Sequence, residues 1–102
     1  MKLMTKQLQK RFEQVGSQKE CLNPIVVCKC FCPRNSWTWY AIEFNKENGI
    51  FFGYVIGDYQ ERGCFSLKEL ENVQGPYGLK IERDLRFSES LFLDLNVEYA
   101  LN

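Results

Sequence analysis

Apolar side chains near the start of the chain recur with the spacing of an amphipathic helix. Leu8, Phe12 and Val15 stand at i, i+4 and i+7, so they share one helical face. Thr5 is placed to cap the first turn, and Gly16 is placed to end the last one. The pattern predicts an N-terminal helix that packs its apolar face against a core.

Three later runs of apolar, aromatic and β-branched residues have the character of strands. They are IVVCKCFC over residues 25–32, WTWYAIEFN over 37–45 and IFFGYVIG over 50–57. The turn sequence KENG joins the second run to the third, with Gly49 suited to a positive φ. We therefore expect a three-stranded antiparallel meander in which the second and third runs form a hairpin.

A loop, a second helix and a mixed tail are predicted after the third run. Residues 58–63 have the composition of a loop, and Ser66 and Glu69 have the spacing of a capping box for a helix over about 66–73. In the tail, LKIERDLRF can be extended and SESLFLDL can form a short helix. Together these elements predict an α+β fold in a single domain over residues 1–102, with the helices on one face of the sheet.

The length of the KENG turn determines which side chains of the hairpin share a face. If Glu47, Asn48 and Gly49 form a three-residue loop, Lys46 pairs with Ile50. One face is then large and nearly all apolar, as expected of a core face, and it carries Tyr40, Ile42, Phe44, Phe52, Tyr54 and Ile56. The opposite face carries Trp37, Trp39, Ala41, Glu43, Phe51, Gly53, Val55 and Gly57.

In this register Trp39 lies across from Gly57, and Glu43 lies across from Gly53. Two tryptophans beside two glycines and a carboxylate have two interpretations. Either the rings cover the glycines beneath a packed loop or helix, or they form a shallow aromatic groove in which Glu43 is the polar contact for a bound segment or ligand. A loop of two or four residues would shift the register by one and change the faces.

Charge is balanced over the whole chain but uneven along it. There are 13 basic and 13 acidic residues, which argues against a protein devoted to nucleic-acid binding. Residues 1–36 nevertheless hold seven Lys and Arg against two Glu. Aromatic residues make up 15%, which favours an aromatic surface. No stretch has the pattern of a signal peptide or a membrane span, so we expect a cytoplasmic protein with reduced thiols and no membrane partner.

The segment CKCFC places three of the five cysteines within five residues. In a strand, Cys28, Cys30 and Cys32 point to the same side at intervals of about 6.5–7 Å, which is too far apart for ligands of one zinc ion. The chain also contains no His. We therefore expect no metal and no cofactor, with these thiols facing the core and Lys29 and Phe31 facing the other way.

The absence of His also excludes Ser–His and Cys–His nucleophile systems. An enzyme would have to rely on carboxylates such as Glu43 and Asp84, and carboxylates alone are a weak signal. A small enzyme built on these two residues is therefore the lowest-ranked alternative, and we expect no catalytic residues.

The runs NSWTWYAIEF…GIFFGYVIG and FSLKELENVQGPYGLKIERDLRF carry a family resemblance. Over roughly residues 1–90 the chain resembles a small uncharacterised bacterial family, the domain of unknown function numbered 2958. Genes of that family are often carried on plasmids, conjugative elements and phages, sometimes beside anti-restriction and DNA-processing genes. The resemblance implies a cytosolic accessory protein of a mobile genetic element, and it implies no known activity.

These patterns favour a non-enzymatic interaction protein that binds an unidentified protein partner, such as a host-defence or DNA-processing protein, through the aromatic hairpin face. The predicted binding residues are Trp37, Trp39, Glu43, Gly53, Arg83 and Asp84. The alternative is weak nucleic-acid binding, in which cations near the N-terminus contact phosphates and the tryptophans stack on bases. The cations of that alternative are Lys2, Lys6, Lys10 and Arg11.

Overall fold

The computed structural model describes residues 2–73 and 80–95. In chain order its elements are α1 (Lys6–Val15), β1 (Ile25–Val26), β2 (Cys28–Phe31), β3 (Thr38–Asn45), β4 (Ile50–Ile56), β5 (Gln60–Ser66), α2 (Leu67–Asn72), β6 (Glu82–Arg83), β7 (Ser90–Leu91) and the 3-10 helix η2 (Phe92–Leu95).

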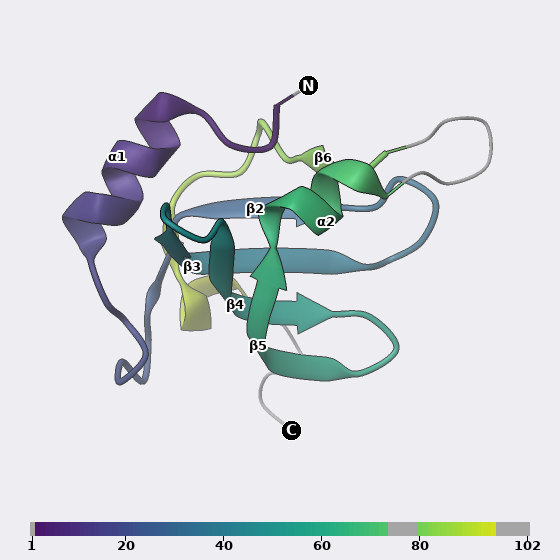
Figure 1. The fold of residues 1–102 in the computed structure, drawn as a ribbon. Helices are drawn as coiled ribbons and strands as arrows, with labels where there is room; N and C mark the ends of the chain where they lie inside the picture. The colour runs from purple at the N-terminus through teal and green to yellow at the C-terminus, as the bar shows by residue number, and fades with distance from the viewer. Residues whose placement is uncertain (1, 74–79, 96–102) are drawn as a thin grey trace.

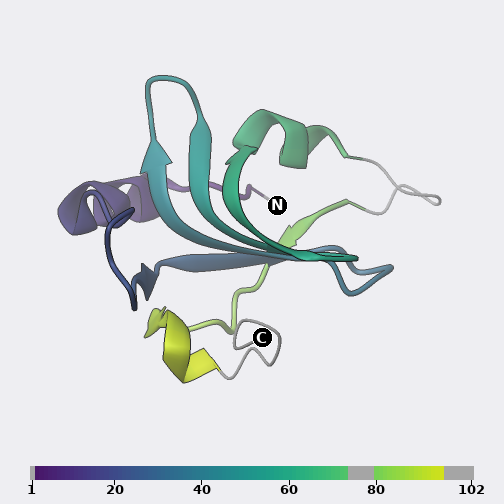
Figure 2. The same cartoon turned by 90° about the horizontal axis from the view of Figure 1, so that it is seen from below.

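Within the described residues, five strands form an antiparallel sheet in the order β5-β4-β3-β2-β6, and β1 pairs with β7 in a separate two-stranded ribbon. Figure 1 shows β2 to β5 following one another across the sheet, with β6 returning beside β2. Figure 2 shows α1 and α2 on one side of this sheet and η2 on the other. The arrangement confirms the α+β class and the placement of both α-helices on one face.

Side-chain caps begin both α-helices where the sequence predicts them. Thr5 Oγ1 accepts a hydrogen bond from the Leu8 N–H at 3.1 Å, and Gly16 ends α1 with a φ of 71°. At α2, Ser66 Oγ accepts from the Glu69 N–H at 3.2 Å. Each cap satisfies an amide donor that the first turn of a helix leaves without an intrahelical partner.

The predicted loop over 58–63 is wrong from residue 60 onward, because Gln60–Ser66 forms β5 and pairs with β4 along its whole length. β5 lies at the sheet edge and carries charged side chains and a glycine, so it lacks the apolar alternation of a half-buried strand. The predicted strand over 25–32 also divides at Val27, which separates β1 from β2. The predicted meander is therefore the centre of a larger sheet.

The hairpin between β3 and β4 has a four-residue loop, so the predicted three-residue register is wrong. Asn45 pairs with Ile50, which leaves 46–49 as the loop. The Asn45 side-chain oxygen accepts hydrogen bonds from two N–H groups within this loop, at 2.9 and 3.4 Å. Gly49 has the expected positive φ, at 70°. These contacts hold a wider turn than the composition of KENG alone indicates.

A β-bulge at Ile42 changes the register a second time. Ala41 pairs with Gly53, whereas Glu43 pairs with Phe52, so Ile42 is the additional residue of β3. A bulge rotates the following side chains relative to the preceding ones. The predicted pairing of Glu43 with Gly53 is therefore wrong, and Glu43 does not share a face with the tryptophans.

Gln18 explains where the bulge forms. Its side chain is 5% exposed, and its Nε2 donates to the Ile42 carbonyl and to the Ile25 carbonyl at 2.8 Å each. Its Oε1 accepts from the Ile25 N–H at 2.7 Å. The loop after α1 thus supplies the hydrogen bonds that the irregular backbone of β3 needs.

Both faces of the sheet are covered by apolar side chains, which corrects the prediction of one core face. The residues buried on the side of the α-helices are Leu3, Phe12, Val27, Cys28, Cys30, Ala41, Phe51, Leu70 and Ile81. Those buried on the other side are Val26, Ile42, Tyr54, Ile56 and Phe92. Because of the bulge, Phe44 packs with the first group and not with Ile42.

The segment CKCFC is a strand whose thiols face the core, as predicted. Cys28 and Cys30 are buried, Cys32 is partly buried beside them, and all five thiols are free. Burial raises the pKa of Cys28 and of Cys30 to about 12. Lys29 points the other way, with its ammonium 5.8 Å from the centre of the Tyr40 ring.

Candidate binding groove

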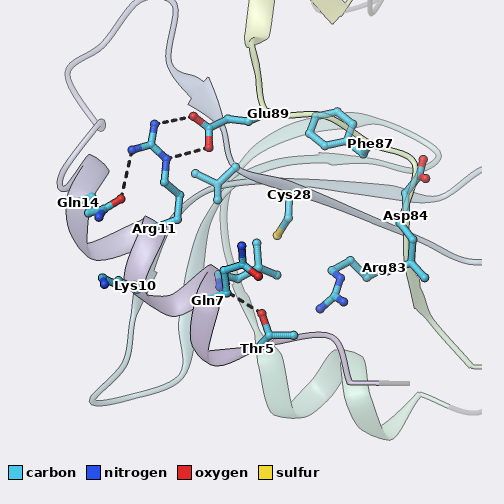
Figure 3. Close-up of a pocket in the computed structure, with 13 residues that line it drawn as sticks. Thr5, Gln7, Lys10, Arg11, Gln14, Cys28, Arg83, Asp84, Phe87 and Glu89 are labelled. Carbon is cyan, nitrogen blue, oxygen red and sulfur yellow. Dashed lines mark hydrogen bonds and ion pairs between the residues drawn. The ribbon is translucent and has the colours of Figure 1, made fainter.

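A groove of about 740 Å³ lies between α1 and the segment that follows β6 (Figure 3). Side chains of α1 form one wall, and residues 83–89 contribute to the other. Its apolar lining residues are Leu8, Val27, Cys28, Leu85 and Phe87. Its charged lining residues are Lys10, Arg11, Arg83, Asp84 and Glu89.

The wall after β6 is fixed where the chain leaves the sheet. β6 places Arg83 opposite Cys30 of β2. The Asp84 N–H then donates to the Lys29 carbonyl at 2.9 Å, and the Asp84 carboxylate lies 3.6 Å from the Lys29 ammonium. The other carboxylate oxygen of Asp84 accepts from the Arg86 N–H at 2.9 Å. Asp84 is therefore an anchor of this wall as well as a lining residue.

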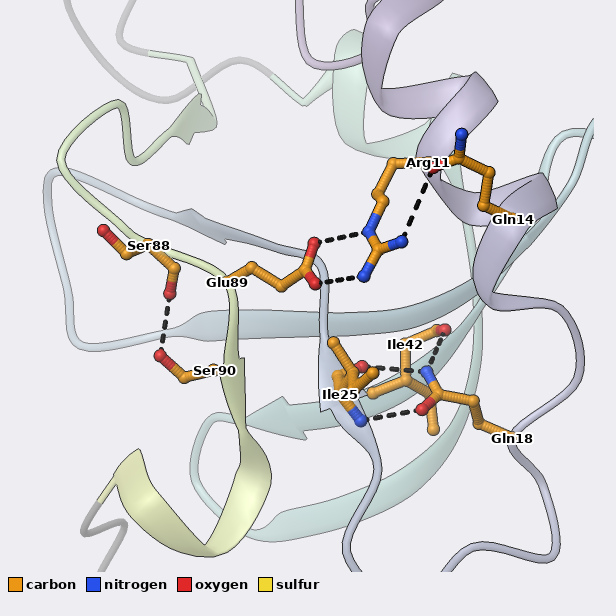
Figure 4. Close-up of polar contacts among 8 residues, drawn as sticks. All are labelled: Arg11, Gln14, Gln18, Ile25, Ile42, Ser88, Glu89 and Ser90. Carbon is orange, nitrogen blue, oxygen red and sulfur yellow. Dashed lines mark hydrogen bonds and ion pairs between the residues drawn. The ribbon is translucent and has the colours of Figure 1, made fainter.

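An ion pair connects the two walls of the groove (Figure 4). Arg11 Nε donates to Glu89 Oε2 at 2.8 Å, and Arg11 Nη2 donates to Glu89 Oε1 at 2.5 Å. These hydrogen bonds raise the pKa of Arg11 and lower the pKa of Glu89. Because both side chains are accessible to water, the pair stabilises the fold little. Its two-point geometry instead sets the separation of the walls.

Arg83 links the N-terminal segment to the same wall. Its Nη1 donates to the Lys2 carbonyl at 3.0 Å and to the Leu3 carbonyl at 3.2 Å. Leu3 is buried beneath α2 in the helix-side core. The Arg83 guanidinium thus holds the segment that precedes α1 against β6. The opposite wall of the groove begins at the end of this strand.

Apolar side chains in the groove remain accessible between these charges. Leu85 is 69% exposed, and Phe87 is half-buried. An exposed apolar surface bordered by charged groups of both signs is typical of a contact surface for protein. The arrangement can bind an extended segment by covering the apolar residues and pairing with the charges.

The predicted tryptophans are not among the residues that line this groove. Their ring centroids are 6.1 Å apart and both are half-buried. Trp39 lies opposite Val55, not opposite Gly57 as predicted, and it packs against the core beneath α2. Trp37 covers Gly57, since a Cβ built on that glycine would lie 2.5 Å from Trp37 Cε2. These contacts favour the interpretation in which the rings cover packed residues.

Gly53 and Glu43, two further predicted binding residues, lie apart from the groove. Gly53 is buried, and a Cβ there would overlap the Tyr40 carbonyl oxygen, so β4 requires a glycine at this position. Glu43 lies opposite Phe52 and lines a separate hollow. Asp84 lines the groove instead, so Glu43 and Asp84 form no shared carboxylate site.

Only two of the four cations of the nucleic-acid alternative line the groove. Lys2 and Lys6 are exposed and do not line the groove, whereas Lys10 and Arg11 do. The groove therefore unites Lys10 and Arg11 with Arg83 and Asp84, which the sequence assigns to separate hypotheses.

Among the groove residues that were not predicted, Leu85, Phe87 and Glu89 belong to the wall that follows β6. Their alternate positions suggest one face of an extended segment. The chain instead turns at Leu85 and Arg86, where the Phe87 N–H donates to the Asp84 carbonyl at 3.3 Å, so the spacing indicates Phe87 and Glu89 but does not account for Leu85. The pairing of Glu89 with Arg11 has no local signal, because 78 positions separate the two residues.

The described part of the chain contains neither a cluster of metal-ligating side chains nor a membrane-spanning helix. Among residues 2–73 and 80–95, no group of three or more His, Cys, Asp or Glu side chains is arranged to hold a metal ion. No helix within those ranges is long and apolar enough to cross a membrane.

No curated protein and no solved structure matches this chain. A family model described as "Protein of unknown function (DUF2958)" matches residues 2–102. The match extends beyond the predicted resemblance over roughly residues 1–90 and includes the C-terminal segment. The chain belongs to this family of proteins of unknown function.

Proposed function

We propose that the protein is a non-enzymatic interaction module that holds an extended segment of a protein partner between α1 and residues 83–89. The composition of the groove supports this proposal, because apolar side chains lie among charges of both signs. A protein segment offers apolar side chains, backbone polar groups and charges of either sign, so it is complementary to such a surface.

Leu85 is the apolar residue from which we expect the largest contribution. It is 69% exposed, so a bound segment can remove most of its side chain from water. Full burial of a leucine side chain is worth about 1.5–3 kcal/mol. This corresponds to a change of about ten- to hundredfold in the dissociation constant.

Nucleic-acid binding has less support at this groove. Arg11 already donates two hydrogen bonds to Glu89, and the Asp84 carboxylate lines the same surface. A phosphate would therefore meet two carboxylates and would have to compete for Arg11.

The cellular setting is part of the proposal and depends on the family. Frequent carriage of such genes on mobile elements supports a cytoplasmic accessory role, with a host-defence or DNA-processing protein as the partner. Trp37 and Trp39 stay as a second predicted contact surface, because both residues are only half-buried.

Selection from a peptide-display library against the immobilised protein tests the groove. Selected peptides should bind a Leu85→Glu variant at least about tenfold more weakly. They should retain their affinity for Leu22→Glu, which alters a leucine that is 95% exposed and lies outside the groove. Nuclear magnetic resonance should place the bound peptide between α1 and residues 83–89. Equal binding by both variants, or contacts on another face, would show that the groove is not the binding site.

A further inference from the structure

Glu43 has a carboxylate without a partner in the described part of the chain. It stands directly after the bulge in β3 and is half-buried. Its Oε2 atom is shielded from solvent and accepts no hydrogen bond there. No Lys or Arg among the described residues forms an ion pair with it. Carboxylate oxygens in such positions are costly and rare in native proteins, so a ligand that supplies the missing counter-ion would account for this one.

Glu43 lines a hollow of about 520 Å³ between the loop after α1 and the β3–β4 hairpin. The volume lies within the range of small-ligand sites. The aromatic residues of the hollow are Phe12, Phe44, Phe51 and Phe52. Phe12, Phe44 and Phe51 belong to the cluster beneath α1, so Phe52, which pairs with Glu43 across the hairpin, is the ring beside the carboxylate. A carboxylate beside an aromatic ring suits a cation with an apolar stem.

Two lysines also line the hollow, and neither forms an ion pair with Glu43. Lys46 pairs with Glu13 at 3.0 Å. The Lys19 ammonium and the Arg62 guanidinium both lie over the Phe52 ring, 5.5 and 5.3 Å from its centroid. The position of Lys19 shows that this wall accepts an ammonium group, while the Glu43 carboxylate stays unpaired.

We propose that this hollow binds a primary ammonium group on an aliphatic chain, with the Glu43 carboxylate as counter-ion. A charge-assisted hydrogen bond to the Glu43 carboxylate would place a positive charge near the oxygen that is shielded from solvent. A lysine side chain of another protein and a free alkyl diamine share this chemistry. The site is separate from the groove beside α1 and does not depend on the proposed function.

Titration with n-butylamine near neutral pH, followed by amide chemical shifts, tests the site. We expect saturable shifts around Glu43 and Phe52 with a dissociation constant on the order of 1 mM. The uncharged n-butanol should produce no saturable shifts. Glu43→Gln keeps the shape of the side chain and should weaken amine binding by at least about tenfold. Glu71→Gln is the control, because Glu71 is exposed on α2 and does not line the hollow, and it should leave the affinity unchanged.

Three results would overturn the proposal. The first is equal binding of butanol and butylamine, a comparison that needs no variant, and the second is undiminished affinity in a folded Glu43→Gln protein. The third is amine binding that appears only after Lys19→Gln, which would identify Lys19 as the counter-ion in the native protein. Stronger binding of Nα-acetyl-lysine methylamide than of putrescine would indicate a protein lysine as the ligand. The reverse order would indicate a free diamine.

Discussion

Replacing Gln18 by leucine should destabilise the protein by about 3–5 kcal/mol, although Gln18 lies in a connection and not in a helix or strand. Its side chain donates to the Ile25 and Ile42 carbonyls and accepts from the Ile25 N–H (Figure 4). One amide therefore joins the loop after α1 to β1 and to the bulge of β3. Leucine has a similar size but can make none of these hydrogen bonds.

The magnitude follows from the three backbone groups that lose their partner. Each buried polar group left without a hydrogen bond costs about 1–3 kcal/mol. The Ile42 carbonyl should carry the largest share, because Ile42 is completely buried. Water can reach the groups of half-buried Ile25, and burial of the leucine side chain offsets part of the loss. The net loss is a large fraction of the roughly 5–15 kcal/mol that stabilises a domain.

Urea unfolding followed by circular dichroism measures this loss. With a slope of about 1–3 kcal/mol per molar urea, the midpoint should fall by about 2 M. Gln14→Leu is the matched control, because Gln14 is exposed on α1 and its side chain accepts one long hydrogen bond from Arg11, at 3.5 Å. It should change stability by no more than about 0.5 kcal/mol. A loss below about 1 kcal/mol for Gln18→Leu, or one equal to the control, would refute the explanation of the bulge.

Further outcomes follow from the ion pair, the glycines and the thiols. The pKa of Glu89 is lowered in the folded state, so its contribution to stability is present above the unfolded pKa and is lost as pH falls through the folded pKa. Because the pair is exposed, urea unfolding of wild type and Glu89→Gln should differ only slightly near neutral pH and converge in acid. Gly57→Ala should displace the Trp37 ring, shift tryptophan emission to longer wavelength and lower stability by about 1 kcal/mol. Gly63→Ala, where an added Cβ meets nothing within 4 Å, should leave both properties unchanged. In timed alkylation with iodoacetamide, the two exposed thiols should react in the folded protein and the two thiols buried in β2 only after unfolding.

Local patterns were sufficient for the helices and for the cysteine strand. The cap of α1 depends on Thr5 and Leu8, three positions apart, and the burial of Cys28 and Cys30 depends on a period of two. Such contacts are determined by neighbours in sequence, so the sequence predicts them well. The same reasoning did not predict β5, because an edge strand tolerates charged residues and its composition is then similar to that of a loop.

The bulge and the groove depend on contacts between residues far apart in the chain, which sequence patterns do not reveal. The bulge depends on Gln18, which lies 24 positions before Ile42. The groove depends on Arg11 and Glu89, whose separation along the chain hides their pairing. Sequence reasoning therefore identified Lys10, Arg11, Arg83 and Asp84 as candidates but could not show that they share one groove.

The bulge resolves a conflict within β3 that the simple alternation of side chains creates. Without Ile42 as an additional residue, Glu43 would continue the face of Trp39 and Ala41 and would be directed into the apolar cluster beneath α1. Phe44 would leave that cluster at the same time. The bulge instead keeps Phe44 in the core and moves the carboxylate to the neighbouring hollow. A single inserted residue thus keeps a charge out of the core and creates the site that we propose for an ammonium ligand. The register of β3 therefore has to be known before its polar residues can be interpreted.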